Sequence, residues 1–375
     1  MSETTGAGPG AQRGAIEVPE DAAQSGEAVS GETPCGEAVS GEAASGEAAS
    51  GETARGEAVA GEAGTGEAGT GEAVREENGT NGAAPDGGGA ETGVARTALL
   101  VAAARAIETH RPDALARDPY AEHFVRAAGG CSAWPLHPDD IPGGEADPLW
   151  GRLGRYFALR TRVLDDHLGH AAHSGERQVV LLGAGLDTRA LRLPWPAGTV
   201  VYEIDQAPVL AFKQRVLDAL PPVPGAAERR LVAADVREDW TGPLKEAGFD
   251  PAQRTAWLAE GLFLYLPADA EARLLADLHA RSAAGSSLAY EVKLGLETAA
   301  VRDSPVYAET RRRLGIDLLG LFDPEPRPDS AATLAALGWR TESRTPFAHS
   351  RALGRGPLPE ENDALAANRW VFALK

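Results

Sequence analysis

The chain contains few of the residues that build covalent or metal-bound frameworks. Only two of its 375 residues are cysteines, Cys35 and Cys131, too few for a disulfide framework or a zinc set. Its eight histidines show no H-x-x-x-H spacing, which would place two ligands on one helix face, so no metal site is expected. The sequence also lacks a Gly-x-Ser-x-Gly motif, and this absence argues against Ser-His-Asp catalysis.

Long apolar runs and basic surfaces are missing as well. No stretch approaches 20 apolar residues, so no membrane span is expected. The N-terminus has no charged segment followed by an apolar one, and a secretory signal is therefore not expected. No stripe of Lys or Arg indicates a nucleic-acid surface. These absences favour a cytoplasmic protein, and they leave the oligomeric state open.

The first 93 residues contain no aromatic side chain. A pentapeptide, Gly-Glu-Ala/Thr-x-x, repeats ten times from Gly26 to Gly71, and the segment holds 18 acidic and 3 basic residues. Such a composition buries too little apolar surface to offset the entropy lost on ordering. A period of five with glycine in every copy also leaves no strand or helix to stack as a solenoid. We therefore expect residues 1–93 to form a disordered acidic repeat tail.

The remaining residues, 94–375, have the length of one large domain. Apolar residues at helical spacing predict three helices before the first strand, at 97–109, 121–128 and 150–168. Because they precede the sheet, we expect residues 94–172 to form an N-terminal helical cap over it.

Strand and helix patterns alternate regularly after residue 178. Strands are predicted at 178–182, 199–204, 230–234, 255–259 and 286–291, and two more near 338–342 and 369–374. Helices are predicted between them at 187–192, 207–219, 240–247 and 268–282. This alternation predicts an α/β fold, a doubly wound and mostly parallel seven-stranded sheet. Residues 293–330, with a helix near 299–314, interrupt the alternation, and we expect them to form a lid over the ligand site.

The segment Gln178–Arg192, QVVLLGAGLDTRALR, is the most informative part of the chain. A short apolar run from Val179 to Leu182 is typical of a strand buried on both faces. Gly183 and Gly185 allow a tight turn and a close approach of the backbone to a ligand. The N–H groups of the following helix would face that ligand. This order predicts the first unit of a nucleotide-binding sheet.

Carboxylates follow the next strands at the edge where such sheets bind ligands. The strand ends carry Glu203 and Asp205, then Asp235 with Val236, then Glu260. An acidic residue at the second strand end holds ribose hydroxyls in nucleotide folds, and Asp205 is nearer the edge than Glu203. A carboxylate directly after an apolar strand, as at Glu260, indicates a function.

The sequence of the glycine loop distinguishes between two classes of cofactor. A dinucleotide site prefers G-x-G-x-x-G, whereas here Thr188 takes the place of the third glycine and Asp187 lies within the loop. A carboxylate there competes with a pyrophosphate for the same N–H groups, but it tolerates a ligand with an ammonium group and no phosphate. S-adenosylmethionine is such a ligand and is favoured over NAD. Asp187 itself is expected to be a helix cap, and Trp240 and Tyr265 are expected to be core aromatics.

Seven segments of the chain match one known family in order. They are TALLVAAARAIE, DPYAEHF, RYFALRTRVLDDHL, QVVLLGAGLDTRALRL, VYEIDQAPVLAFK, AADVREDW and AWLAEGLFLYLP. On these segments, residues 94–375 resemble the class I S-adenosylmethionine-dependent methyltransferases of the leucine carboxyl methyltransferase and polyketide O-methyltransferase group, closest to its actinobacterial branch. The resemblance implies a Rossmann-like methyltransferase fold and S-adenosylmethionine as cofactor. The repeat tail lies outside it.

The resemblance also implies roles for residues around the methionine part of the cofactor. Arg160 would pair with the methionine carboxylate, and Arg162, two residues along the same helix, is the alternative. Gly183 and Gly185 would line the methionine portion. Glu260 would lie near the ammonium or sulfonium group.

For the nucleoside part, Asp205 would hold the ribose hydroxyls. Asp235 would accept a hydrogen bond from the adenine amino group, and Val236 would pack on the ring or offer its backbone N–H. No catalytic residue is assigned. The strand-end motifs carry no histidine base, so a carboxylate acceptor, which needs none, is favoured over a phenol.

We therefore expect an O-methyltransferase acting on a carboxylate or hydroxyl of a small, polyketide-like or other natural product. Two alternatives remain. One is a cofactor-binding module without transfer activity, and the other is an NAD-dependent oxidoreductase.

Overall fold

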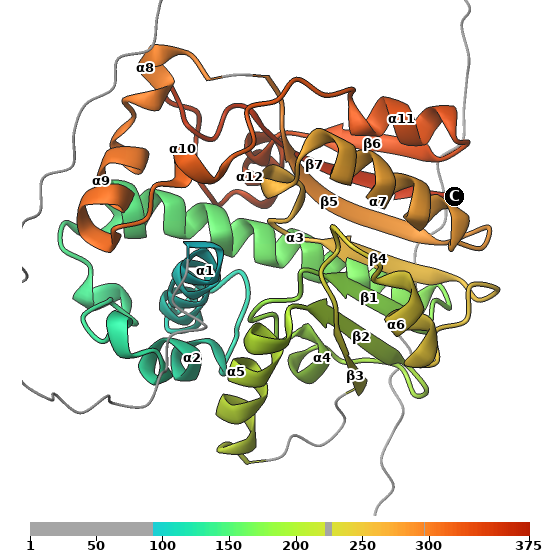
Figure 1. Cartoon of the computed structure of the whole chain (residues 1–375). Coiled ribbons are helices and arrows are strands. Elements are labelled where there is room, and N and C mark those ends of the chain that lie inside the picture. The colour runs from blue at the N-terminus through green and yellow to red at the C-terminus, as the bar shows by residue number, and fades with distance from the viewer. Residues whose placement is uncertain (1–92, 222–226, 296) are drawn as a thin grey trace, which may run out of the picture. The chain divides into compact units, whose positions relative to one another are not determined.

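The computed structural model describes residues 93–221, 227–295 and 297–375 (Figure 1). The chain separates into two units, Met1–Asn78 and Gly79–Lys375, and every described residue belongs to the second. The predicted disordered tail, residues 1–93, lies almost wholly outside the described ranges, and only Gly93 falls within them. Among the helices in those ranges, none is both long enough and apolar enough to cross a membrane.

One seven-stranded sheet forms the centre of the described unit. Its strands are β1 (Gln178–Leu182), β2 (Val200–Asp205), β3 (Glu228–Ala233), β4 (Thr255–Ala259), β5 (Ser287–Lys293), β6 (Arg340–Arg344) and β7 (Asn368–Leu374). They lie in the order β3-β2-β1-β4-β5-β7-β6, and only β7 runs antiparallel to its neighbours. The predicted doubly wound, mostly parallel seven-stranded α/β sheet is confirmed.

The strand order reverses at β1, and the register places the neighbouring strand ends together. Leu182 at the end of β1 pairs with Ile204 on β2, and Leu181 pairs with Leu258 on β4. The residues that follow β1, β2 and β4 therefore meet at one edge of the sheet. This switch point is where open parallel sheets bind ligands.

Alternating apolar residues bury both faces of the sheet. On one face, Val179 and Leu181 pack against α3 (Gly154–His173), which contributes Leu164 and Leu168. On the other face, the strands pack against α6 (Thr241–Glu246), α7 (Ala268–Ala280) and α11 (Ser330–Ala336). Cover on both sides explains why the central strands β1 and β4 are fully buried and mostly apolar, whereas β3 and β6 at the two edges are largely exposed.

The helices before β1 pack together beside the sheet. They comprise α1 (Gly93–Thr109), α2 (Ala121–Ala127) and a π-helical turn (Pro148–Leu153) that runs directly into α3. The carboxylate of Asp147 begins that turn by accepting hydrogen bonds from the backbone N–H groups of Leu149 and Trp150. Apolar residues of these helices share one core cluster with α9 (Pro305–Leu314) and α10 (Leu318–Leu321). Figure 1 shows α1 and α9 on the same side of the sheet.

Several helices differ from the prediction for local reasons. The helix after the glycine loop, α4, spans only Arg189–Arg192. The single helix expected near 299–314 is two helices, α8 (Ala299–Arg302) and α9, because Pro305 has no N–H to continue the first. The short helices α11 and α12 (Pro346–Leu353) were not predicted. The remaining helix, α5 (Ala207–Asp218), lies close to its expected bounds.

Candidate functional site

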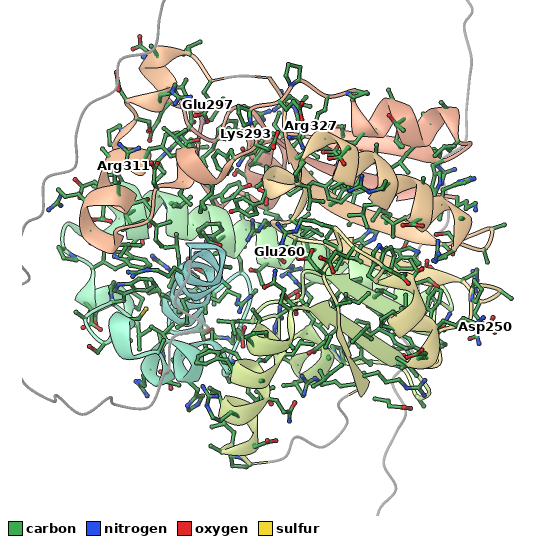
Figure 2. All side chains as sticks on the ribbon, in the orientation of Figure 1. Asp250, Glu260, Lys293, Glu297, Arg311 and Arg327 are labelled. Carbon is green, nitrogen blue, oxygen red and sulfur yellow. The ribbon has the colours of Figure 1, made fainter. Side chains whose placement is uncertain are left out.

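A cavity of about 290 Å³ lies at the carboxyl ends of β1, β2 and β4, where α1 and α3 cover the edge of the sheet. All seven residues predicted to bind a cofactor line it: Arg160, Gly183, Gly185, Asp205, Asp235, Val236 and Glu260. Glu260 lies where the sheet meets these two helices (Figure 2). The strands bring the positions from Gly183 to Glu260 to this edge, and α3 adds Arg160.

The glycine loop has a backbone conformation that side chains resist. Gly183 and Gly185 have φ angles of +62° and +44°, in the left-handed region. A Cβ atom on Gly183 would lie 3.1 Å from Cδ1 of Leu262. The backbone N–H of Gly185 donates a hydrogen bond of 2.6 Å to Oδ2 of Asp205, which ties the loop to the second strand. The loop therefore presents bare backbone to the cavity.

Glu203 and Asp205, on the same side of β2, have different environments. Glu203 is fully buried between Lys213, at 2.9 Å, and Arg229, at 2.8 Å. Asp205 lines the cavity, and burial raises its pKa although hydrogen bonds from the N–H groups of Gly185 and Gln206 oppose the shift. Glu203 is thus a structural residue, whereas Asp205 has a carboxylate beside the space for a ligand.

The third strand end places Asp235 and Val236 on the cavity wall. Arg237 donates to Asp235, from Nη2 at 2.5 Å, and this hydrogen bonding lowers the pKa of Asp235. The side-chain amide of Gln206 donates to the same carboxylate at 3.3 Å, which links the second and third strand ends. Val236 packs at the margin of the core cluster on the α6 and α7 face.

Arg160, Glu260 and Arg189 form a buried charge network behind the glycine loop. Arg160 Nη2 lies 2.9 Å from Glu260 Oε1, and Arg189 Nη1 lies 2.7 Å from Glu260 Oε2. Arg160 also pairs with Glu291 on β5, and its guanidinium carbon lies 4.8 Å from the ring centre of Phe157. Burial by itself would raise the pKa of Glu260, but the guanidinium groups of Arg189 and Arg160 lower it to about 2. Glu260 is therefore anionic at neutral pH.

Sequence reasoning missed two arginines of this network. The sequence pattern predicts only that Arg189 belongs to the helix after the loop. Its guanidinium is buried and also contacts Asp187 and Asp165. Arg105, on α1, lines the cavity, lies 3.0 Å from Asp118 and donates to the carbonyl of Leu186 at 2.6 Å. Neither lies at a strand end, so the strand-end rule could not identify them.

Asp187 binds the start of α4, as expected of a helix cap, although Thr188 is the residue directly before the helix. Its Oδ1 accepts a hydrogen bond of 2.7 Å from the N–H of Arg189, and its Oδ2 pairs with the Arg189 side chain. Its carboxylate therefore occupies the first free N–H of the short helix α4, to which a phosphate would otherwise bind.

Of the two aromatic residues expected in the core, only one lies there. Tyr265, expected in the core, is only partly buried, lines the cavity and hydrogen-bonds with Thr97. Trp240 is buried in the core, as expected. Arg162, the alternative to Arg160, pairs with Asp166 one turn along α3 and does not line the cavity.

The donor set fits a cationic nucleoside without phosphate. The cavity offers the carboxylates of Asp205, Asp235 and Glu260, together with bare backbone at Gly183 and Gly185. Nε of Arg160 is buried and makes no hydrogen bond with any residue in the described ranges. Carboxylates suit a ribose diol and an ammonium group, and a guanidinium N–H suits a carboxylate. No cluster of three or more His, Cys, Asp or Glu within the described ranges could hold a metal ion.

Comparisons with known proteins agree with this chemistry. Residues 98–279 match the family model described as leucine carboxyl methyltransferase. A protein of Streptomyces coelicolor that carries the name of an S-adenosyl-L-methionine-dependent methyltransferase is 61% identical over 76% of this chain and 94% of its own length. A protein of Saccharopolyspora erythraea with the same name is 47% identical over 76% of this chain and 96% of its own length.

Among solved structures, one of a DUF574 family protein from Streptomyces avermitilis is 17% identical and covers 68% of this chain and 95% of that one, with a TM-score of 0.42.

Proposed function

The chain belongs to the leucine carboxyl methyltransferase family of S-adenosylmethionine-dependent methyltransferases, and we propose that it methylates an oxygen atom of a small-molecule acceptor. The observation that carries the site assignment is the meeting of seven separate positions on one cavity at the switch point of the sheet. The cofactor is S-adenosylmethionine, as in the named relatives.

The nucleoside would lie against the ends of β2 and β3. Asp205 accepts hydrogen bonds from the ribose hydroxyls with the lone pairs that Gly185 and Gln206 leave free. Asp235 and Val236 hold the adenine ring, the first by accepting from its amino group and the second by packing.

The methionine part would lie between the glycine loop and α3. Gly183 and Gly185 give it room, and the free Nε–H of Arg160 donates to its carboxylate. Glu260 holds Arg160 in place and provides the negative charge that an ammonium or sulfonium group needs.

When bound, S-adenosylmethionine supplies a methyl group whose bond to the cationic sulfur breaks with both electrons left on sulfur, while the acceptor oxygen forms the new bond. The protein's residues align the acceptor and exclude water. No histidine lines this cavity among the described residues, which supports an acceptor that needs no strong base. A carboxylate meets that condition directly, and a hydroxyl meets it once a neighbouring group takes its proton.

The dinucleotide alternative is weakened by Asp187, whose carboxylate occupies the N–H where a pyrophosphate would bind. Calorimetric titration of the full chain with S-adenosylmethionine, S-adenosylhomocysteine and NAD tests the cofactor. We expect the first two to bind and NAD not to bind. Binding of NAD alone would contradict the assignment.

Transfer is tested with methyl-labelled cofactor and a panel of aromatic acids, polyketide acids, phenols, hydroxylated amines and C-terminal peptides. Base-labile label marks an ester, and base-stable label marks an ether. Transfer only to nitrogen or carbon would refute the oxygen acceptor. Cofactor binding without transfer to any compound or cell extract would favour the silent binding module.

A further inference from the structure

A second cavity, of about 450 Å³, shares a wall with the first. Leu262 and Tyr265 line the first cavity, whereas Phe263 and Leu264, on the same short turn, line the second. The ring of Tyr265 stacks on Phe322 of the second cavity, with centroids 5.9 Å apart and planes 18° apart. A molecule in the second cavity would therefore lie next to the cofactor site.

Most of the second cavity is apolar. Its walls come from η5 (Phe263–Tyr265), the end of β5, α10 and the residues up to Ser330. Apolar lining residues include Phe263, Leu264, Val292, Leu319, Phe322, Pro324, Pro326 and Pro328. Such walls suit an aromatic or aliphatic body.

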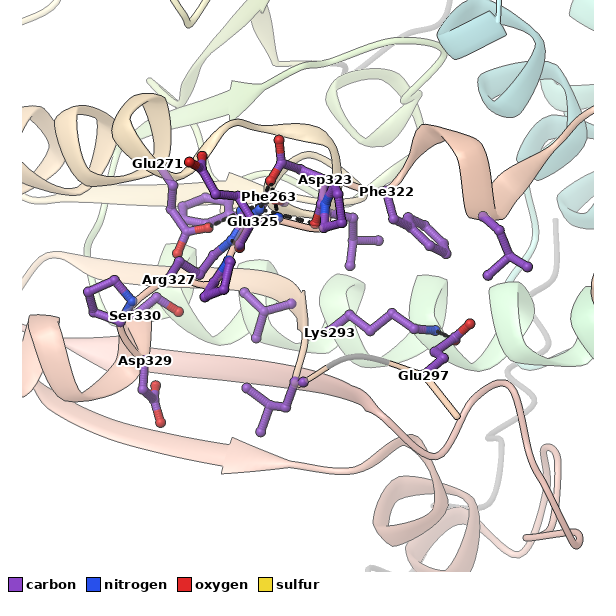
Figure 3. Close-up of a pocket in the computed structure, with 18 of the residues that line it drawn as sticks. Phe263, Glu271, Lys293, Glu297, Phe322, Asp323, Glu325, Arg327, Asp329 and Ser330 are labelled. Atoms are coloured by element: carbon purple, nitrogen blue, oxygen red, sulfur yellow. Dashed lines mark hydrogen bonds and ion pairs between the residues drawn. The ribbon is translucent and has the colours of Figure 1, made fainter. Parts of the chain in front are cut away.

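The polar groups lie at two ends of this cavity (Figure 3). At one end, Arg327 donates to the carbonyl of Leu266, to Glu271 and to Asp323, each at 2.8 Å. Its guanidinium is occupied in holding the 322–329 segment against α7. The hydrogen-bond donors of Arg327 at this end are therefore already used within the protein.

The other end holds Lys293, Glu297 and Tyr307. Lys293 Nζ donates to Tyr307 Oη at 2.8 Å and to the carbonyl of Ala364 at 3.1 Å, and it pairs with Glu297. Tyr307 also donates to Glu297. The Lys293 and Glu297 side chains are 10% and 5% exposed. Burial lowers the pKa of Lys293, while Glu297 opposes the shift.

One oxygen of this cluster lacks a hydrogen bond. Lys293 and Tyr307 both contact Oε1 of Glu297, while the buried Oε2 accepts no hydrogen bond from any residue that the structure describes. A buried acceptor without a donor costs free energy, and a charged one costs more. Because Glu297 lines the cavity, a rotation of its carboxylate would bring the buried Oε2 to a donor on a molecule there.

We propose that the second cavity binds the methyl acceptor and that Oε2 of Glu297 selects an apolar small molecule carrying a hydrogen-bond donor, a hydroxyl or an ammonium group, at its end away from the methylated oxygen. This proposal rests on the methyl transfer proposed above.

The test uses three fluorinated probes of one shape: 4-fluorobenzylamine, 4-fluorobenzyl alcohol and 4-fluorobenzoate. Their affinity for the full chain, saturated with S-adenosylhomocysteine, is measured by ¹⁹F NMR titration. We expect the amine and the alcohol to bind at least about tenfold more tightly than the benzoate, because only they donate to Oε2.

Glu297→Gln should reverse this order. The amide oxygen can still accept from Lys293 and Tyr307, so the amide N–H₂ replaces Oε2 and becomes a donor. The amine and alcohol should weaken about tenfold and the benzoate should tighten. The matched control is Glu325→Gln, an exposed carboxylate on the same cavity wall, which should leave all three affinities unchanged.

An unchanged order of affinities in Glu297→Gln, or the same change in Glu325→Gln, would overturn the proposal. If Glu297→Gln does not fold, binding of the three probes is measured instead with Leu319→Trp, whose larger side chain fills the cavity. Loss of all three probes with retained S-adenosylhomocysteine binding would support the site, and unchanged probe binding would refute it.

Methyl transfer separates this inference from the proposed function. With any acceptor that the labelled panel reveals, 4-fluorobenzylamine should inhibit competitively, and non-competitive inhibition would overturn the acceptor site. Failure of S-adenosylmethionine to bind would instead refute the proposed function, whatever the probes do.

Discussion

The two cavities adjoin each other but are built differently. The cofactor cavity takes its walls from strand ends and from α1 and α3, and its buried charges largely pair with one another. The second cavity takes most of its wall from residues 293–330 and keeps a buried oxygen of Glu297 without a donor. Under the two proposals above, the sheet holds the cofactor, while the segment after β5 selects what is methylated.

The strongest test of the cofactor cavity is Glu260→Gln. Loss of this charge leaves Arg160 and Arg189 buried without their shared partner, and we expect a loss of about 3–5 kcal/mol in the free energy of unfolding. Urea denaturation at neutral pH measures it. Glu325→Gln is the exposed control, and an equal loss in both variants would contradict the assignment.

The same variant also tests how the free energy of unfolding depends on pH. Because the pKa of Glu260 is lowered to about 2 in the folded protein, the unfolded chain binds the proton first as pH falls below about 4.5. Wild-type stability should therefore fall between about pH 4.5 and pH 2, by roughly 3 kcal/mol from this residue. The stability of Glu260→Gln should lack that part of the decline. The same slope of stability against pH in wild type and variant would contradict the lowered pKa of Glu260.

Arg160→Lys should weaken S-adenosylmethionine binding by about 2–3 kcal/mol, because lysine keeps the charge but loses the planar set of donors. The control lies on the same helix. Arg162→Lys, at a residue paired with Asp166 outside the cavity, should leave the affinity unchanged by calorimetry. If Arg162→Lys is the damaging change, the assignment of the cofactor carboxylate is wrong.

Asp205→Ala should cost roughly 1.5–3 kcal/mol in S-adenosylmethionine affinity, the value of hydrogen bonds to a charged group. Glu203→Gln on the same strand should instead lower the melting temperature with little effect on affinity, because Glu203 pairs with Lys213 and Arg229 and is not among the described residues that line the cavity. Calorimetry and thermal melting of both variants separate the two roles. Equal affinities in wild type and Asp205→Ala would reject the ribose assignment.

Phe322→Ala tests whether the two cavities can be changed separately. It removes the ring that lines the second cavity and stacks on Tyr265. The affinity for 4-fluorobenzylamine should therefore fall by about 1 kcal/mol. S-adenosylmethionine affinity, measured by calorimetry, should stay within about twofold. A larger loss for the cofactor than for the probe would contradict the separation.

Deletion of residues 1–92 should have the smallest effect. The repeats contain no aromatic residue, and every residue named in either cavity follows residue 93. Cofactor affinity of the truncated chain should equal that of the full chain by calorimetry. A clear loss of affinity, or protection of the segment from proteases in the intact protein, would refute the prediction of a dispensable disordered tail.

The sequence predicted that the residues at the strand ends meet at one cavity, because the strand ends of a parallel sheet must meet. Gly183, Asp205 and Glu260 could each be located from the apolar run before it. The same logic failed for Arg189 and Arg105, whose roles depend on how helices pack on the loop rather than on any strand.

The second cavity was beyond such prediction. Residues 293–330 are expected from the sequence to form a lid over the ligand site, but the pairing of Lys293, Glu297 and Tyr307 depends on the break between α8 and α9. Tyr265 was expected in the core because aromatic residues usually lie there, whereas it forms the partition beside Phe322.

That partition has a thermodynamic consequence. Tyr265 lines the cofactor cavity, Phe322 lines the second cavity, and their rings stack on each other. An occupant of one cavity that shifts either ring therefore changes the shape of both cavities. Linkage requires that the factor by which one ligand changes the affinity of the other be the same in both directions. If an occupant of either cavity moves the stacked pair, the change in affinity that this contact produces for one ligand is therefore matched by the same factor for the other.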